Sequence, residues 1–222
     1  MRVLIGCEFS GRVRDAFLAK GHDAISCDLL PTDVPGPHYQ GDIFDIIDDG
    51  FDLAIFHPPC TYLTVSGNKW FKPEFKDRFP TRHQDREDAI EFIMKLANCN
   101  IPKIAIENPV GVLSTRWRKP DQIIQPWMFG DAESKKTCLW LKNLPKLVPT
   151  DIVEPLYYKN EDGTDYKDSG GARYSVTHYM AGRGHGIYKN QTPSGQNKLG
   201  PSADRAKIRS LTYLGIAEAM SS

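Results

Sequence analysis

The strongest chemical motif of the sequence is a cysteine that follows two prolines, in His57-Pro58-Pro59-Cys60. The motif comes directly after residues 51–56, an apolar segment typical of a buried strand. Two prolines fix the backbone and hold the next side chain rigidly at the end of that strand. A thiol becomes a nucleophile where a cation or a helix N-terminus lowers its pKa. The motif therefore predicts that Cys60 is a nucleophile.

An inert, buried thiol is the alternative interpretation of an isolated cysteine. We expect it for the other four cysteines, which are Cys7, Cys27, Cys99 and Cys138. The five cysteines are odd in number and contain no CxxC pair. This pattern favours reduced thiols and excludes a disulfide framework or a zinc cluster. We therefore expect no metal site.

A carboxylate, Glu107 of Glu107-Asn108-Pro109, directly follows a second apolar segment at residues 103–106. Beside a thiol, such a group can act as an acid or as a hydrogen-bond donor. Taken alone, it is equally typical of a structural ion pair.

Three further polar positions lie in the first part of the chain: the loop Cys7-Glu8-Phe9-Ser10-Gly11, Asp28, and Asp42 in Gly41-Asp42-Ile43. In open α/β sheets, a glycine after the first strand lets the backbone approach a cofactor, and a carboxylate after the second binds ribose hydroxyls. No GxGxxG motif follows the first strand, which disfavours a dinucleotide-dependent oxidoreductase.

The elements that position these residues alternate between strand and helix. We predict strands at 2–6, 23–27, 51–56, 103–106 and 136–141, and helices at 12–20 and 84–98. This order predicts an α/β fold with a doubly wound, mostly parallel sheet, in which the motifs meet at one edge. Residues 158–200 have no clear period, and a final helix is expected from Ser202 to about Met220.

The motifs together resemble those of the S-adenosylmethionine-dependent DNA (cytosine-5) methyltransferases, as a short, phage-type member. Phe9-Ser10-Gly11 is similar to the first cofactor loop of that family, Asp28 to its ribose carboxylate, and Gly41-Asp42-Ile43 to its GD motif. Pro58-Pro59-Cys60 resembles the nucleophile loop, and Glu107-Asn108-Pro109 the Glu-Asn-Val motif. These motifs occur in the family's order over the first half of the chain.

The resemblance implies a Rossmann-like class I methyltransferase fold and a covalent mechanism on a base flipped out of the DNA. Cys60 would add to C6 of cytosine and Glu107 would hold or protonate N3. S-adenosylmethionine, or a derivative of it, would be bound by Phe9, Ser10, Gly11, Asp28, Asp42 and Pro58. The family's base-contacting arginine has no clean counterpart, and Lys135 is the nearest cation. Thr61 also stands where the family carries glutamine.

On this interpretation, residues 1–112 form the cofactor-binding and catalytic core. Residues 113–200 hold the rest of the sheet and a short, loop-rich DNA-recognition region, and 201–222 form a helix that packs back on the core. The candidate DNA-binding residues are Arg173, His178, Arg183, Lys189 and Arg209. An ordinary polar loop is the alternative for this segment. Because the recognition region is short, a protein partner or an oligomer is also compatible with the sequence.

The distribution of charged side chains also divides the sequence into two parts. The 222 residues carry 28 basic and 28 acidic side chains, but residues 1–60 hold 4 basic and 10 acidic ones, which leaves 24 and 18 for the remainder. The acidic half fits a sulfonium nucleoside better than a polyphosphate, and the basic half fits DNA. No apolar run is long enough to span a membrane. We expect a cytoplasmic protein of a bacterial or phage-infected cell.

Three alternatives remain open beside cytosine-C5 methylation. The first is transfer of a modified group from a variant S-adenosylmethionine. The second is methylation of an amino group at cytosine N4 or adenine N6, a chemistry whose motif places an aromatic residue after two prolines. The third is a catalytically silent DNA-binding relative.

Overall fold

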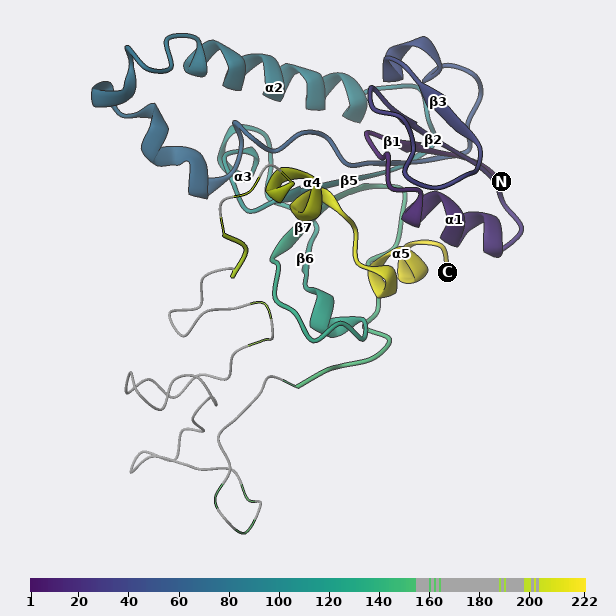
Figure 1. Ribbon diagram of the computed structural model, residues 1–222. Coiled ribbons are helices and arrows are strands. Elements are labelled where there is room, and N and C mark those ends of the chain that lie inside the picture. The colour runs from purple at the N-terminus through teal and green to yellow at the C-terminus, as the bar shows by residue number, and fades with distance from the viewer. Residues whose placement is uncertain are drawn as a thin grey trace. The chain divides into compact units, whose positions relative to one another are not determined.

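Seven strands form one mixed sheet in the computed structural model, which describes residues 1–154, 160, 162, 164, 188, 190, 198–200, 202 and 204–222 (Figure 1). The strands are β1 (Arg2–Gly6), β2 (Asp23–Asp28), β3 (His38–Gln40), β4 (Leu53–Phe56), β5 (Lys103–Pro109), β6 (Gln122–Ile124) and β7 (Thr137–Lys142). Their order in the sheet is β3-β2-β1-β4-β5-β7-β6. Only β7 runs against the others, so the expected α/β architecture with a mostly parallel sheet is confirmed.

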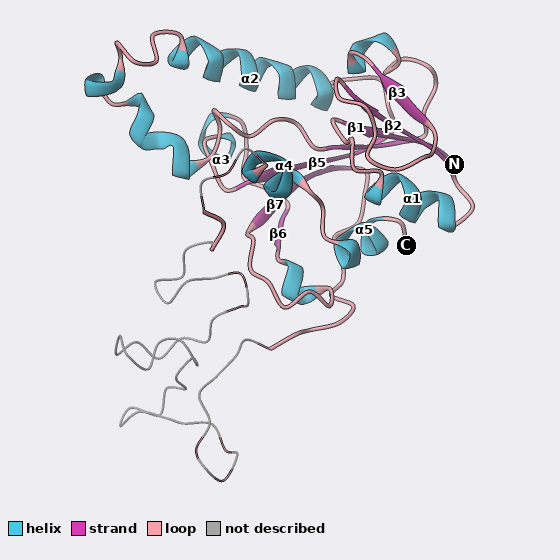
Figure 2. Cartoon of the chain, in the orientation of Figure 1, coloured by secondary structure: helices cyan, strands magenta, loops and turns pink. Residues whose placement is uncertain are grey.

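Helices cover both faces of this sheet. Figure 1 shows α1 (Arg12–Ala19) along one face and α2 (Arg82–Ala97) along the other, and Figure 2 distinguishes the strands from the helices. The shorter helices of this part are α3 (Leu113–Arg116) and the 3-10 helices Ile43–Asp45, Val65–Phe71 and Pro73–Phe75. The chain passes from β1 to β2 on one side and returns to β4 on the other. Ligands bind at such a switch point in open α/β sheets, outside the carboxyl ends of the strands.

The core lies on both sides of the central strands. Leu4 of β1, Phe56 of β4 and Ile106 of β5 pack in one cluster with Ile93 and Leu96 of α2, and none of these five side chains is more than 1% exposed. Fully burying a side chain of this size stabilises a fold by about 1.5–3 kcal/mol. The loops at the carboxyl edge therefore extend from a well-packed core.

The contacts divide the chain into two units. The first contains Met1–Ile124, Lys136–Val148 and Met220–Ser222, and the second contains Gln125–Lys135 and Pro149–Ala219. The sheet with α1, α2 and α3 belongs to the first unit. The second unit includes the 3-10 helix Pro126–Met128.

The single helix expected from Ser202 to about Met220 is wrong. Two short helices stand in its place, α4 (Arg205–Ser210) and α5 (Leu214–Met220). Leu211 between them has an extended backbone, with φ −60° and ψ 132°. The Ser210 hydroxyl donates to the Lys207 carbonyl at 2.7 Å, which is a local bond that competes with helix continuation. Within the part of the chain that the structure describes, no helix has the length and apolar character needed to cross a membrane.

Candidate active site

The nucleophile motif and the Glu107 motif lie side by side at the carboxyl end of β4. The sequence predicts that Glu107 follows its strand, but β5 continues through Glu107-Asn108-Pro109 because these residues pair with β7. Strands β4 and β5 are parallel neighbours, and their register pairs Phe56 with Ile106. Each motif begins at the next residue, so His57 and Glu107 occupy corresponding positions at the carboxyl edge. The sequence-based expectation that the two motifs meet at one edge is confirmed.

Two long-range hydrogen bonds join these strand ends. The distance from His57 Nδ1 to Glu107 Oε2 is 3.3 Å, and the two side chains are only 6% and 16% exposed. The buried Asn108 amide donates to the Pro58 carbonyl at 2.9 Å. We call these two contacts the strand-end clamp. It fixes the backbone that enters Cys60 against the backbone that carries Glu107.

Cys60 itself begins a tight turn. Its carbonyl accepts from the backbone N–H of Leu63 at 3.0 Å and of Thr64 at 3.2 Å, and the residue is half-buried. The Leu63 carbonyl accepts in turn from Val112 N–H at 2.9 Å, beyond the end of β5. A Cβ on Gly111 would lie 2.0 Å from that carbonyl oxygen, so the turn can approach the segment after β5 only because glycine stands there.

Three buried polar atoms at the carboxyl edge have no hydrogen-bond partner among the described residues. They are Glu8 Oε2 after β1, His57 Nε2 after β4 and Asn108 Oδ1 near the end of β5. The three strands are adjacent in the sheet. Because buried polar atoms are nearly always satisfied, three orphans at one edge indicate a place that receives polar groups from a ligand.

Glu8 is a residue that the sequence interpretation did not single out. Its carboxylate accepts from the Ser10 hydroxyl and, at 3.0 Å, from the backbone N–H of Arg12, which is the first residue of α1. Gly11 precedes that helix in the left-handed region, with φ 75°. Glu8 therefore caps α1 through one oxygen and leaves the other unpartnered.

The predicted cofactor residues gather around the ends of β1 and β2. Phe9 accepts a backbone hydrogen bond from Asp33 at 2.9 Å. Asp28 accepts from Leu30 N–H at 2.9 Å, and the exposed Asp42 accepts from Phe44 N–H at 3.0 Å. Pro58 is buried and belongs to the strand-end clamp.

The surroundings of the other four thiols keep them protonated. Burial raises the pKa of Cys7, and the charges of Asp28 and Asp42 raise it further. The same causes raise the pKa of Cys27 to about 12. Burial also raises the pKa of Cys99 and, with the nearby Glu107 charge, that of Cys138. All four stay protonated at neutral pH, as an inert thiol does.

Lys135 lies in the second unit, and its role at the base stays a prediction. Its ammonium donates to the Arg209 carbonyl at 2.9 Å and lies 5.9 Å from the centre of the Tyr213 ring. The Tyr213 hydroxyl donates to Glu133 at 2.5 Å. Arg209 is exposed on α4. The other candidate DNA-binding residues, Arg173, His178, Arg183 and Lys189, lie outside the described residues.

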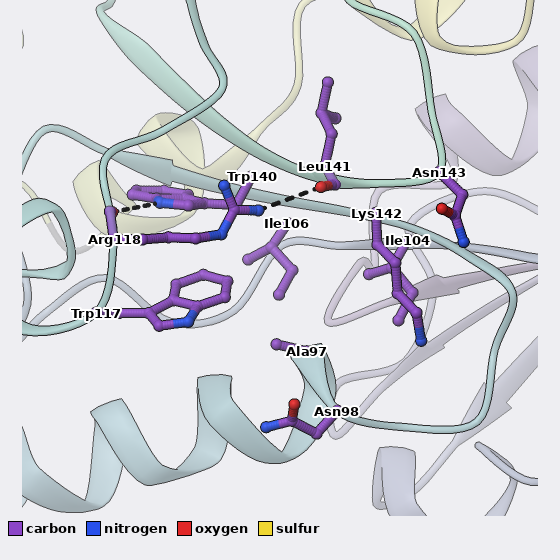
Figure 3. A pocket seen from close by; sticks show the side chains of 10 residues that line it. All are labelled: Ala97, Asn98, Ile104, Ile106, Trp117, Arg118, Trp140, Leu141, Lys142 and Asn143. Atoms are coloured by element: carbon purple, nitrogen blue, oxygen red, sulfur yellow. Dashed lines mark hydrogen bonds between the residues drawn. The ribbon is translucent and has the colours of Figure 1, made fainter.

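A separate cleft of about 490 Å³ opens between the end of α2, β5 and β7 (Figure 3). Trp117 and Trp140 stack at its wall, with ring centres 5.9 Å apart, and Ile104 and Ile106 form its floor. None of the predicted site residues lines it. The described residues also contain no group of three or more His, Cys, Asp or Glu side chains arranged to hold a metal ion.

Comparison with known proteins identifies no family for this chain. No protein-family model matches the chain, and no curated protein matches it.

Proposed function

We propose that this protein transfers a methyl group from S-adenosylmethionine to C5 of cytosine in DNA, on a class I methyltransferase fold. The observation that carries the proposal is the strand-end clamp, because it holds a cysteine turn and a carboxylate together on the adjacent strands β4 and β5, next to the switch point between β1 and β4. A nucleophile and an acid fixed together in this way suit covalent attack on a ring.

The residues divide the reaction between them. The Cys60 thiolate forms a bond to C6 of cytosine, and the electron pair displaced from the ring makes C5 nucleophilic. Glu107 holds a proton at N3, which stabilises the attacked ring more than the ground state. Once C5 carries the transferred methyl group, its proton is lost to a base or water, the C5–C6 double bond re-forms, the bond from C6 to the Cys60 sulfur breaks to release the thiolate, and the N3 proton returns to Glu107.

His57 is the positioning residue for Glu107 in this account. Its Nδ1 lies 3.3 Å from the carboxylate, so the ring fixes the orientation of Glu107. A carboxylate on a free rotor would lose this orientation, and misplacement by about 1 Å costs on the order of 100-fold in rate.

The cofactor region fits a sulfonium nucleoside. The orphan oxygen of Glu8 and the carboxylates of Asp28 and Asp42 supply negative charge and acceptors for hydroxyl and amino groups near the end of β1. When bound, S-adenosylmethionine supplies the electrophilic methyl group that C5 attacks. The carboxylates would repel a pyrophosphate, which makes a dinucleotide a poor alternative.

The test is mass spectrometry of nucleosides from DNA incubated with the protein and S-adenosylmethionine. We expect 5-methylcytosine from the wild type and from Cys99→Ser, and none from Cys60→Ser. Cys99 is the matched control because burial raises the pKa of its thiol and it lies after α2, away from the clamp.

The same spectra separate the alternatives. A larger added mass on cytosine would indicate transfer from a modified cofactor. A methyl group on cytosine N4 or adenine N6 would indicate amino-group methylation. DNA that is bound but unchanged assigns a silent relative. Near-normal 5-methylcytosine from Cys60→Ser would contradict the covalent mechanism.

A further inference from the structure

The segment between Cys60 and α2 carries aromatic and basic side chains that the proposed chemistry does not use. It runs through the 3-10 helices Val65–Phe71 and Pro73–Phe75 and enters α2 at Arg82. In Figure 1 it is the blue segment that leads into α2. Residues 69–86 contain six Lys or Arg and three Asp or Glu, which is a positive excess.

Its outer part is built around Trp70. Phe75 and Phe79 meet the indole edge to face, with ring centres 4.9 and 5.5 Å away. The Lys69 ammonium lies 4.3 Å from the indole centre, and the Arg78 guanidinium lies 5.6 Å from it. We call these five residues the cation–aromatic cluster.

The cluster faces solvent with its charges uncompensated. Lys69 and Arg78 are exposed and Trp70 is only half-buried. Neither cation forms an ion pair or a hydrogen bond with any described residue. An exposed cation over a ring contributes only about 0.5–1 kcal/mol, so folding stability alone gives little reason for this arrangement.

Two arginines of α2, Arg82 and Arg86, contact the segment and support it. Arg86 lies 3.3 Å from the centre of the Phe71 ring and donates to the Tyr62 carbonyl at 2.8 Å. Arg82 lies within 5.5 Å of the centres of the Tyr62, Phe71 and Phe79 rings. Burial, followed by the charge of Arg82, lowers the pKa of Arg86, so two cations are held close together. Their fields add to those of Lys69 and Arg78.

This support ties the cluster to the nucleophile. Tyr62 is two residues from Cys60, and Leu63 N–H donates to the Cys60 carbonyl at 3.0 Å. A ligand bound to the cluster is therefore connected through this support to the turn that begins at Cys60.

We propose that the cation–aromatic cluster binds an unpaired stretch of the DNA strand that carries the target cytosine, with a base on the Trp70 ring and phosphates at Lys69 and Arg78. Aromatic faces interleaved with cations are the pattern that binds single strands, because every base offers a π-face and every nucleotide offers a charge. An acidic peptide would use the cations but has no need of the indole. The identity of the nucleic acid as DNA rests on the proposed function.

The test is the anisotropy of a fluorescently labelled 12-nucleotide single strand and of the matching duplex, titrated with the full chain over a range of salt. We expect the wild type to bind the single strand more tightly. Trp70→Leu should weaken single-strand binding about tenfold and duplex binding less. Lys69→Gln combined with Arg78→Gln should lower the slope of log K against log salt by about 1.4, or 0.7 for each phosphate contact.

The control is Lys20→Gln combined with Lys103→Gln, which removes two exposed charges, one at the end of α1 and one at the start of β5, away from the carboxyl edge. It should leave the salt slope within about 0.3 of the wild type. If Trp70→Leu does not fold, as judged by circular dichroism, the Lys69 and Arg78 variant decides alone. Equal effects of the two double variants, or displacement of the strand by polyglutamate at equal charge, would overturn the proposal.

Mass spectrometry of nucleosides, run with the same variants, separates this proposal from the proposed function. Normal methyl transfer with unchanged single-strand binding in Trp70→Leu would refute the cluster alone. The expected binding losses without any methyl transfer would refute the function and leave a single-strand surface.

Discussion

The loops after β1 and β2 hold their polar side chains differently from the loops after β4 and β5. Asp28 and Asp42 each accept from the backbone two residues further on, and Glu8 from Arg12, four residues on. The clamp, in contrast, joins residues that are 50 positions apart in the sequence. The carboxylates of the first region are held by nearby backbone, and the side chains of the clamp are held across the completed sheet.

This difference separates two tasks. Local turns let a carboxylate keep one oxygen for a ligand while the other supports the loop, which suits binding. A clamp between strand ends fixes a nucleophile relative to an acid, which suits bond making. Substitutions in the second region should therefore reduce the rate most, and those in the first should reduce affinity and local stability.

Glu107→Gln should have the largest effect. Gln cannot transfer a proton to N3, so we expect methyl transfer to fall about 10²–10⁴-fold with little change in folding. Single-turnover kinetics with the wild type and with Glu91→Gln measures it. Glu91 is an exposed partner of Lys95 on α2, so its variant should retain full activity. If Glu107→Gln were as active as that control, Glu107 would not be the acid of the reaction.

Asn108→Ala should have the next largest effect, on stability and on rate together. It deletes the buried donor to the Pro58 carbonyl, and we expect the free energy of unfolding to fall by about 1–3 kcal/mol. Urea unfolding measures it against Asn98→Ala, which loses only an exposed bond to the Met94 carbonyl. Equal losses in the two variants would show that the clamp contributes nothing beyond an ordinary surface bond.

Glu8→Gln tests the first region. It removes the negative charge at the start of α1, and we expect a loss of about 1 kcal/mol in the free energy of unfolding. Because the orphan oxygen also disappears, S-adenosylmethionine affinity measured by calorimetry should drop more than the single-turnover rate with cofactor at saturation. A rate loss at saturation as large as that of Glu107→Gln would break the division between the two regions.

Alkaline pH should leave the rate at neutral pH unchanged and lower stability alone, in part through a thiol of the first region. Burial and the neighbouring Asp28 raise the pKa of Cys27 from 9.0 to about 12, so the folded state keeps a proton that the unfolded chain releases. Stability is therefore complete below pH 9 and falls between pH 9 and 12. Urea unfolding at pH 8, 9, 10 and 11 should show a shallower decline for Cys27→Ala, and identical slopes would contradict this cause.

The parts predicted from sequence are those coded by local pattern. Apolar runs indicate the ends of β1, β2 and β4 and the start of β5, and parallel pairing then requires the motifs to meet. The three further residues of β5, Glu107-Asn108-Pro109, pair with β7, and no local pattern indicates that pairing. Strands β3 and β6 have three residues each, too few for a periodic signal.

The parts missed depend on distant partners. Nothing near His57 or Asn108 in the sequence indicates that they bond to Glu107 and Pro58. Arg82 and Arg86 contact the rings of Phe79 and Phe71 only once α2 has folded beside the cation–aromatic cluster. No glycine or proline at Leu211 indicates that the helix ends there.

The covalent role of Cys60 is the central claim, and a DNA duplex with 5-fluorocytosine at the target position tests it most directly. Fluorine cannot leave C5 as a proton does, so the adduct between the Cys60 sulfur and C6 cannot eliminate. Intact-mass measurement after denaturation should show protein joined to DNA for the wild type and Cys99→Ser, and none for Cys60→Ser. Methylated DNA without an adduct, or an adduct that persists in Cys60→Ser, would contradict the account.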